Sequence, residues 1–279
     1  MYKEKTNHYD MRLQFVSLSQ HCLTLRTSIV NDSVTFGTMM AFFSFIFSLV
    51  AMVVICHIFS TMNPDGIFYA IFDSFLVLLL PLFLILLTRR YIYNITLNSD
   101  VVLNRNTKKI YFYSNGNEYI CDLSCIELLG GLKTTHLIIY TCDSDDVKTE
   151  HKIEFDTHWN FTFIVSYINS FVNKGSSEVL IPERYDWDDV KQKKIYLKPM
   201  EIISHYKPWP FCSWPCDEGE RTMKIYLWPL YLVFFFPLFV ISSFIWWGIC
   251  WYGKVQIHPV PKDSYESDNS VQVTPEWPS

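Results

Sequence analysis

The chain has 279 residues, of which 50% are hydrophobic and 17% are aromatic. This composition is too apolar and too aromatic for an average soluble domain of the same length. The formal net charge of -5 provides no basic field that would hold a polyanion, so nucleic-acid binding is discarded.

Residues 1–33 are expected to form a cytoplasmic N-terminal segment. Within it, residues 11–25 mix apolar and polar side chains without a clean helical or strand period. This pattern indicates either an extra strand or an amphipathic piece on the membrane surface, and the sequence does not choose between them. The first apolar run begins only at Val34 and is too long for a signal-peptide core, so no cleavable signal is expected.

Residues 34–88 predict a transmembrane helical hairpin with spans at 34–59 and 67–88, each about as long as the roughly 20 apolar residues needed to cross a bilayer. Small and hydroxyl residues in the first span, including Gly37 and Ser44, favour close packing on a neighbouring helix. The second span contains Asp73. Because a carboxylate in hydrocarbon is costly, Asp73 is a candidate functional residue, and the alternative is a hydrated or paired structural role.

Basic residues flank the hairpin and are absent from its loop. Lys and Arg precede the first span, and Arg89 and Arg90 directly follow the second. The positive-inside rule therefore predicts that both outer ends of the hairpin are cytoplasmic. We expect a multi-pass membrane protein with a cytoplasmic N-terminus.

Residues 89–174 predict a cytoplasmic β domain, because the long apolar runs give way to short segments rich in β-branched and aromatic residues. Strands are expected at 91–97, 101–103, 110–113, 119–120, 125–129, 136–141 and 152–155, with a turn signal at Ser114-Asn115-Gly116-Asn117. The period then becomes helical over 159–171, so an amphipathic helix closes the meander. The expected fold class is an α+β membrane protein whose β domain has a pleckstrin-homology-like outline, which by itself supplies no function.

The rest of the chain alternates irregular and apolar sequence. Residues 175–224 form a connector rich in Trp and Pro, and residues 225–252 predict a third transmembrane helix that contains Pro229 and Pro237. We expect one kinked span rather than a re-entrant element, with Trp246, Trp247 and Trp251 in an outer aromatic girdle. Residues 253–279 are polar and acidic and are expected to form an external, poorly ordered tail.

No catalytic signature occurs in the sequence, so a non-enzymatic protein without a cofactor is expected. The eight cysteines include two C-x-x-x-C pairs, which make a weak candidate metal site, although free thiols in a reducing cytoplasm are the preferred interpretation. The four cysteines of that site are Cys121, Cys125, Cys212 and Cys216. His151 and His158 are interpreted as surface residues, with an acid/base or metal pair as the alternative.

Three features together resemble poorly characterised bacterial inner-membrane proteins that are often encoded beside type VI secretion effectors. They are the hairpin ending in Arg89-Arg90, the Trp-Pro-rich approach to a last span, and a β-hairpin whose tip reads Asn104-Arg105-Asn106-Thr107-Lys108-Lys109. The resemblance implies an immunity protein that protects its producer from a toxin acting at the cytoplasmic membrane. It carries over no catalytic residues.

On this hypothesis the spans pack against the inserting helices of a pore-forming toxin within the lipid bilayer. The expected contacts are Gly37, Ser44, Asp73, Trp228, Trp246 and Trp247. The alternative is a membrane-tethered adaptor or sensor, in which the β domain binds a cytoplasmic peptide or a lipid headgroup. A membrane enzyme has the least support, because Asp73 is the one Asp, Glu, Lys or Arg residue within the predicted spans.

Overall fold

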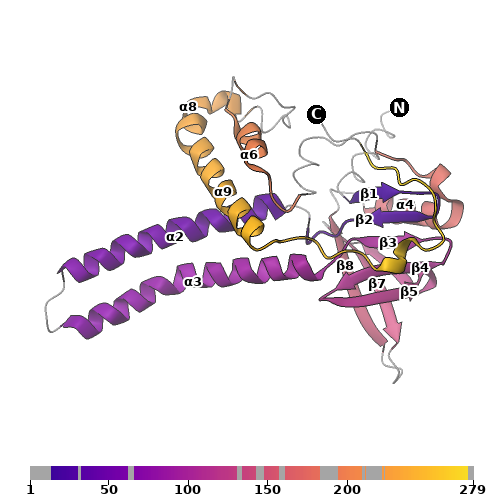
Figure 1. Ribbon diagram of the computed structural model, residues 1–279, viewed down its shortest axis with the longest axis horizontal. Coiled ribbons are helices and arrows are strands. Elements are labelled where there is room, and N and C mark those ends of the chain that lie inside the picture. Colours follow the sequence, from indigo (N-terminus) through magenta and orange to yellow (C-terminus); the bar gives the residue numbers. More distant parts are fainter. Residues whose placement is uncertain are drawn as a thin grey trace. The chain divides into compact units, whose positions relative to one another are not determined.

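The chain folds into two compact units in a computed structural model (Figure 1). The β unit consists of Met1–Ser33, Asn94–Ile195 and Gln256–Ser279, and the helical unit of Val34–Tyr93 and Tyr196–Val255. The structure describes residues 14–30, 33–61, 66–130, 134–142, 148–156, 161–182, 194–208, 211, 222 and 224–275. The β unit is therefore assembled from segments that lie before, between and after the long apolar helices.

A five-stranded antiparallel sheet forms the centre of the β unit, with the strands in chain order. The strands are β1 (Phe15–Leu18), β2 (Cys22–Leu25), β3 (Val101–Asn104), β4 (Lys109–Ser114) and β5 (Asn117–Asp122). The N-terminal segment thus supplies two strands, of which β2 pairs with β3 from beyond the hairpin. This decides the alternative that the sequence left open.

The turn between β4 and β5 follows directly from its sequence. Asn115 and Gly116 both have positive φ angles, 52° and 80°, while Ser114 pairs with Asn117. Two central residues with positive φ are typical of the type I′ turn, whose twist matches that of the strands it joins. The predicted turn at Asn115-Gly116 is confirmed.

A second antiparallel sheet and a helix complete the β unit. The sheet has the order β6 (Ile126–Gly130), β7 (Thr134–Cys142) and β8 (Lys148–Asp156), and α4 (Phe161–Lys174) follows it. Ile164, Ile168 and Phe171 of α4 share one buried core with residues of the five-stranded sheet and with Ile153 of β8. The predicted helix and the three strands before it are confirmed to within a few residues.

The five-stranded sheet is covered on both faces, so every residue of β2 and β3 is buried. Leu23 and Leu103 point into the core under α4. On the opposite face Cys22, Val102 and Tyr111 form a separate cluster that packs against residues of the C-terminal tail. The yellow tail crosses these strands in Figure 1.

The tail, residues 256–275, is held at both ends by isolated bridges. Ser99 forms a parallel bridge with His258, and Leu18 forms an antiparallel bridge with Val273. This corrects the expectation of a poorly ordered tail, because the tail belongs to the same compact unit as the strands. The polar composition suggested disorder, but in the structure polar side chains hold this segment in place.

Two long apolar helices, α2 (Ser33–Thr61) and α3 (Ile67–Leu97), form a hairpin in the helical unit. Their extents confirm the two predicted helices, but the expected strand at 91–97 is wrong because α3 continues through it. β-Branched residues in a helix cost only a few tenths of a kcal/mol each, and a helix that is already nucleated gains a hydrogen bond for each added residue. Asn98 ends α3 by donating from Nδ2 to the carbonyl of Asn94.

Buried or half-buried positions on α3 recur at alternating spacings of four and three residues, while most other side chains are exposed. This spacing is typical of a narrow contact seam along one face of a helix. The seam is mostly made of small or compact residues and includes the proline inside the helix. Its members are Ala70, Ser74, Val77, Pro81, Leu84 and Thr88.

The third apolar stretch is helical but not uniform. It comprises α8 (Trp228–Leu230), the π-helical segment η4 (Tyr231–Phe235) and α9 (Phe236–Tyr252), preceded by the short helix α6 (Pro199–Tyr206). Pro229 and Pro237 stand in the first turns of α8 and α9. Because the π-helical segment runs directly into α9, Pro237 interrupts the backbone hydrogen bonding of a continuous helical stretch. Three helices of the described chain are thus long and apolar enough to cross a membrane.

Candidate functional site

A close helix contact lies between α2 and α9. A Cβ atom placed on Gly37 would come within 2.0 Å of the indole ring of Trp246, so the ring rests directly on the glycine backbone. Beside it, the hydroxyl oxygens of Thr38 and Ser243 lie 3.2 Å apart. The packing predicted for small residues on the first span is present at this point.

Trp246 is at the centre of an aromatic cluster that joins three helices. Its ring centroid lies 6.3 Å from that of Tyr91 on α3, and Tyr91 lies 4.6 Å from Phe36 on α2. Because Trp246 is only 1% exposed, it is an internal packing residue and does not belong to an outer girdle. Gly37 and Trp246 contact each other and present no free surface to a partner.

The other predicted contact residues lie in different surroundings. Trp247 packs on a cluster that contains Val34 of α2 and residues of α6, whereas Trp228 is 45% exposed. Ser44 is half-buried, and its Oγ has no hydrogen-bond partner among the described residues. Asp73 is exposed and lies outside the buried seam of α3. The structure does not bring these residues together.

Lys224 is a buried cation that sequence reasoning treated only as a charge flanking the third span. Its side chain is fully buried, and Nζ donates a 3.0 Å hydrogen bond to the carbonyl of His205. The ammonium also lies 5.8 Å from the ring centroid of Tyr231, within cation–π range. The sequence signal was the spacing of Lys224 and Tyr231, which is two helical turns.

A buried polar clamp in the β unit joins the tail to the sheet, and it has Asn104 at its centre. The Nδ2 of Asn104 donates to the carbonyls of Ser264 and Glu266 at 3.1 and 3.0 Å. Its Oδ1 accepts from the backbone N–H groups of Asn106 and Thr107 at 2.9 and 3.2 Å. One amide therefore shapes the β3–β4 turn and holds the tail at the same time.

The carboxylate of Asp268 makes a second attachment. It accepts hydrogen bonds from the hydroxyls of Ser19 and Ser270, and from the backbone N–H of Ser270 at 3.1 Å. Burial favours the neutral acid, but these hydrogen bonds to the charged form outweigh it and lower the pKa of Asp268 below its ordinary value. The tail is thus fastened by an ionised side chain.

Cys22 lies beneath the tail, and its Sγ is 3.7 Å from the carbonyl oxygen of Ser264. Burial, together with the neighbouring Asp268, raises the pKa of the Cys22 thiol to about 12. A thiol in this state is unreactive, because the thiolate is the nucleophile.

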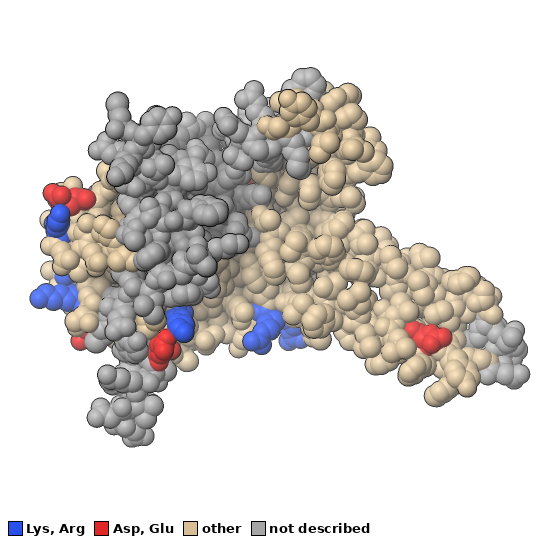
Figure 2. Space-filling model, turned by 180° about the vertical axis from the view of Figure 1, so that it is seen from behind, with Lys and Arg blue, Asp and Glu red and all other residues tan. Residues whose placement is uncertain are grey.

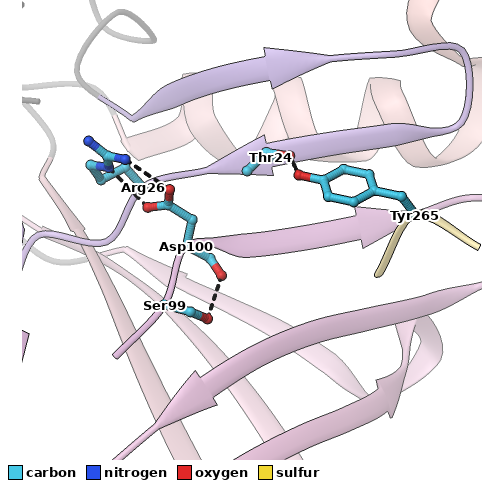
Figure 3. A network of polar contacts seen from close by, with 5 residues as sticks. All are labelled: Thr24, Arg26, Ser99, Asp100 and Tyr265. Atoms are coloured by element: carbon cyan, nitrogen blue, oxygen red, sulfur yellow. Dashed lines mark hydrogen bonds and ion pairs between the residues drawn. The ribbon is translucent and has the colours of Figure 1, made fainter. Parts of the chain in front are cut away.

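The edge of the same face carries an ion pair and a hydroxyl contact (Figure 3). Arg26 and Asp100 form a bidentate pair in which both nitrogen–oxygen distances are 2.9 Å. Farther along β2, the hydroxyls of Thr24 and Tyr265 lie 2.9 Å apart. These contacts connect the N-terminal strands to β3 and to the tail.

Of the four candidate metal residues, only Cys121 has a described side chain. Cys121 is buried in the core of the β unit, while Cys212 and Cys216 fall outside the described residues and the side chain of Cys125 is not described. Within the described ranges no three His, Cys, Asp or Glu side chains are placed to hold a metal ion.

His151 is half-buried rather than a free surface residue. Its ring centroid lies 4.1 Å from that of Tyr119, and burial lowers the pKa of its imidazole. The other histidine of the predicted pair, His158, lies outside the described residues.

These features define the class of the molecule as an α+β membrane protein: an antiparallel β unit combined with three apolar helices of membrane-spanning length. Comparison with family models, characterised proteins and solved structures finds no match to this chain.

Proposed function

We propose that this chain is a non-enzymatic immunity protein of the bacterial inner membrane, which binds and neutralises a pore-forming toxin. The observation that supports it best is the position of Asp73. This carboxylate lies on α3 about 9 Å from the helix start, at 1.5 Å per residue, and outside the buried seam. An acidic group on a helix face open to lipid is costly unless water or a polar partner reaches it.

The hairpin offers a large surface to such a partner. Large apolar side chains on α2 and α3 are exposed along most of their length, and only the narrow seam is buried. Figure 2 shows the hairpin almost entirely tan, with acidic atoms near its loop end. Toxin helices that insert into the same bilayer would pack on this surface and meet Asp73 and the exposed Trp228.

We infer further that the N-terminal strands, the central strands and the tail share the cytoplasmic side. Ile195 and Gln256 both belong to the β unit, so the segment between them leaves and returns on one side of the membrane. In this segment only residues 228–252 form a long apolar run. One complete crossing would end on the opposite side, so this inference requires the third helix to re-enter on the same side, in place of the single kinked span expected from the sequence.

The side of the membrane on which the tail lies is tested by labelling single cysteines with a membrane-impermeant thiol reagent. Lys109→Cys on β4 and Lys262→Cys on the tail both replace exposed residues. We expect both to react in inverted vesicles and neither in whole cells, with the sites assigned by mass spectrometry. Reaction of Lys262→Cys alone in whole cells would refute the shared side.

The β unit also gives grounds for the finer fold proposal. Two antiparallel sheets and the C-terminal helix α4 share one core, as in a pleckstrin-homology-like domain. An adaptor that binds a peptide through this unit is the second candidate function. One contact favours it: the sheet face already holds a segment of polypeptide, the tail, in which Lys262–Tyr265 form a short 3-10 helix.

The immunity proposal is tested by expressing the toxin encoded by the neighbouring gene in cells with and without this chain. Cells that carry the chain should survive, and cells that lack it should die. Asp73→Asn should abolish protection without loss of membrane insertion, whereas Tyr69→Phe, a conservative change at an exposed site one turn away, should protect fully. Equal survival of cells with and without the chain would refute the function.

Capture of the two solubilised proteins as a complex separates the two candidates. If the soluble β unit alone binds the partner, the adaptor gains support, whereas a requirement for the helical unit favours toxin neutralisation.

A further inference from the structure

We propose that the base of the hairpin, the end of α2 and α3 away from their loop, binds the headgroup of an anionic phospholipid through Arg89 and Arg90 of α3. This inference goes beyond toxin binding and concerns the helical unit alone. The ligand that it names belongs to the membrane in which the hairpin lies.

The two arginines stand where the apolar length of α3 ends. The helix begins at Ile67 and contains no Lys or Arg before Arg89. The stretch 67–88 is about 33 Å long at 1.5 Å per residue, which matches a hydrocarbon core of about 30 Å. When the loop end of α3 is at one surface of the bilayer, Arg89 and Arg90 are therefore at the depth of the phospholipid headgroups of the other surface.

One face of α3 changes at this depth from apolar to cationic and then to aromatic. Residues three or four positions apart are neighbours on a helix, so Leu86, Arg89, Arg90 and Tyr93 share this face. All four side chains are exposed. The order fits one phospholipid molecule, because its acyl chains would lie along Leu86 and its phosphate would meet the two guanidinium groups. The ring of Tyr93 then lies in the headgroup layer, where tyrosine is enriched.

The positive charge of this face is not compensated by the described protein. Within the described ranges neither arginine forms an ion pair with a carboxylate. The described acidic residues of the helical unit are Asp73, near the loop end of α3, and Glu201 on α6. Figure 2 shows basic atoms at the base of the hairpin without acidic atoms beside them. Guanidinium groups bind phosphate oxygens in bidentate geometry, so a phosphate headgroup is the matching counter-charge.

A second helix brings the same residue types to this end of the hairpin. Trp246 of α9 lies 6.3 Å from Tyr91 between ring centroids, so this part of α9 is at the base of the hairpin. Trp251, Tyr252 and Lys254 follow within about 12 Å along the chain, and all three are exposed. Aromatic and basic side chains together are typical of the headgroup layer of a membrane.

The inference is tested by native mass spectrometry of the full-length protein in detergent with two lipid probes. Dioleoyl phosphatidylglycerol and dioleoyl phosphatidylcholine have the same acyl chains, and only the first has a net negative charge. We expect the wild type to bind phosphatidylglycerol at least about tenfold more tightly, because each cation near an anionic headgroup strengthens binding roughly fivefold. Arg89→Gln combined with Arg90→Gln should remove this preference and leave the affinity for phosphatidylcholine unchanged.

The matched control is Lys108→Gln combined with Lys109→Gln. These lysines are also adjacent, basic and exposed, but they lie in the β unit. This variant loses the same net charge and should keep the wild-type preference. Inorganic phosphate at millimolar concentration distinguishes the lipid from a free anion, and it should not displace phosphatidylglycerol, since it makes no contact with Leu86.

Three results would overturn the inference: equal affinity of the wild type for both lipids, an equal loss of preference in the lysine control, or displacement of the lipid by inorganic phosphate. If the arginine variant does not fold, the wild type alone decides. Its preference for phosphatidylglycerol should then fall as the ionic strength rises, because exposed charges are screened, and an unchanged preference would contradict the site. The toxin-survival assay does not depend on these outcomes.

Discussion

The β unit and the hairpin contain similar apolar side chains but bury them differently. In the five-stranded sheet Leu23 and Phe112 are at most 1% exposed, whereas Phe68 and Phe83 on α3 are 73% and 56% exposed. Other segments of the chain cover both faces of the sheet, whereas the hairpin is covered only along the seam of α3. Burial against protein stabilises the first region, and the second depends on a lipid or protein environment.

Polar side chains also act differently in the β unit and in the hairpin. In the β unit the side chains of Asn104 and Asp268 connect segments that are far apart in the sequence. In the hairpin the hydroxyls of Ser74 and Thr88 donate to carbonyls one turn earlier in their own helix, those of Ala70 and Leu84. Polar side chains therefore specify the fold of the β unit, whereas in the hairpin they mainly form hydrogen bonds with the backbone of their own helix.

The largest expected effect comes from breaking the clamp at Asn104. Asn104→Ala removes four hydrogen bonds and leaves buried backbone groups unsatisfied, so the free energy of unfolding of the β unit should fall by about 3 kcal/mol. Chemical denaturation measures this free energy when unfolding is followed by the near-UV signals of tyrosine residues. Asn106→Ala is the control, because Asn106 makes only one long contact from its side chain, 3.5 Å to Ser267. Equal losses in the two variants would contradict the role of Asn104.

The next effect concerns the helical unit. Gly37→Ala places a methyl group where the ring of Trp246 lies, so overpacking should cost about 1 to 3 kcal/mol. Gly248→Ala is a matched control in another apolar helix, because a Cβ there meets no described atom within 4 Å. Thermal unfolding in detergent should show a lower midpoint for Gly37→Ala and an unchanged or higher one for Gly248→Ala. The reverse order would show that the α2–α9 contact does not form.

A smaller effect is expected at the ion pair between Arg26 and Asp100. The two groups are mostly buried and bidentate, so a double-mutant cycle with alanine at each position should give a coupling energy of about 1 kcal/mol. Denaturation of all four proteins at low and high salt measures this energy. A coupling energy near zero at both salt concentrations would show that this pair contributes no more than an ordinary surface ion pair.

The smallest effect is a pH dependence at His151. Because burial lowers its pKa in the folded protein, protonation is easier in the unfolded chain, and stability falls as the pH drops below the ordinary value of about 6.5. The loss is complete once the pH is below the folded-state pKa. His151→Phe should remove this part of the acid sensitivity while it keeps the ring contact with Tyr119. Identical pH profiles of stability for the variant and the wild type would count against this contribution of His151.

Local patterns in the sequence predicted the elements that depend on local chemistry. The apolar runs predicted α2 and α3, and Asn115-Gly116 predicted a tight turn. The strand expected at 91–97 failed because the end of α3 depends on the helix already formed before it. β-Branched residues alone do not decide that competition.

The candidate residues were harder to place because their roles depend on distant neighbours. Trp246 looked like an interface anchor, and its burial follows from Gly37 more than 200 residues earlier. The tail looked disordered, and its position follows from Asn104 and Ser19 on strands that no local pattern connects to it. Side-chain recognition over such separations leaves no periodic signal in a single sequence.

The order of assembly in the β unit has a consequence for biosynthesis. β2 ends at Leu25, but its partner β3 begins at Val101, 76 residues later (101 − 25), after both hairpin helices. At translation rates of roughly 5 to 20 residues per second, the β1–β2 pair waits about 4 to 15 s with an unpaired edge. Synthesis of both hairpin helices therefore precedes completion of the sheet. A ribosome-bound chain stalled before residue 101 would present that edge to chaperones.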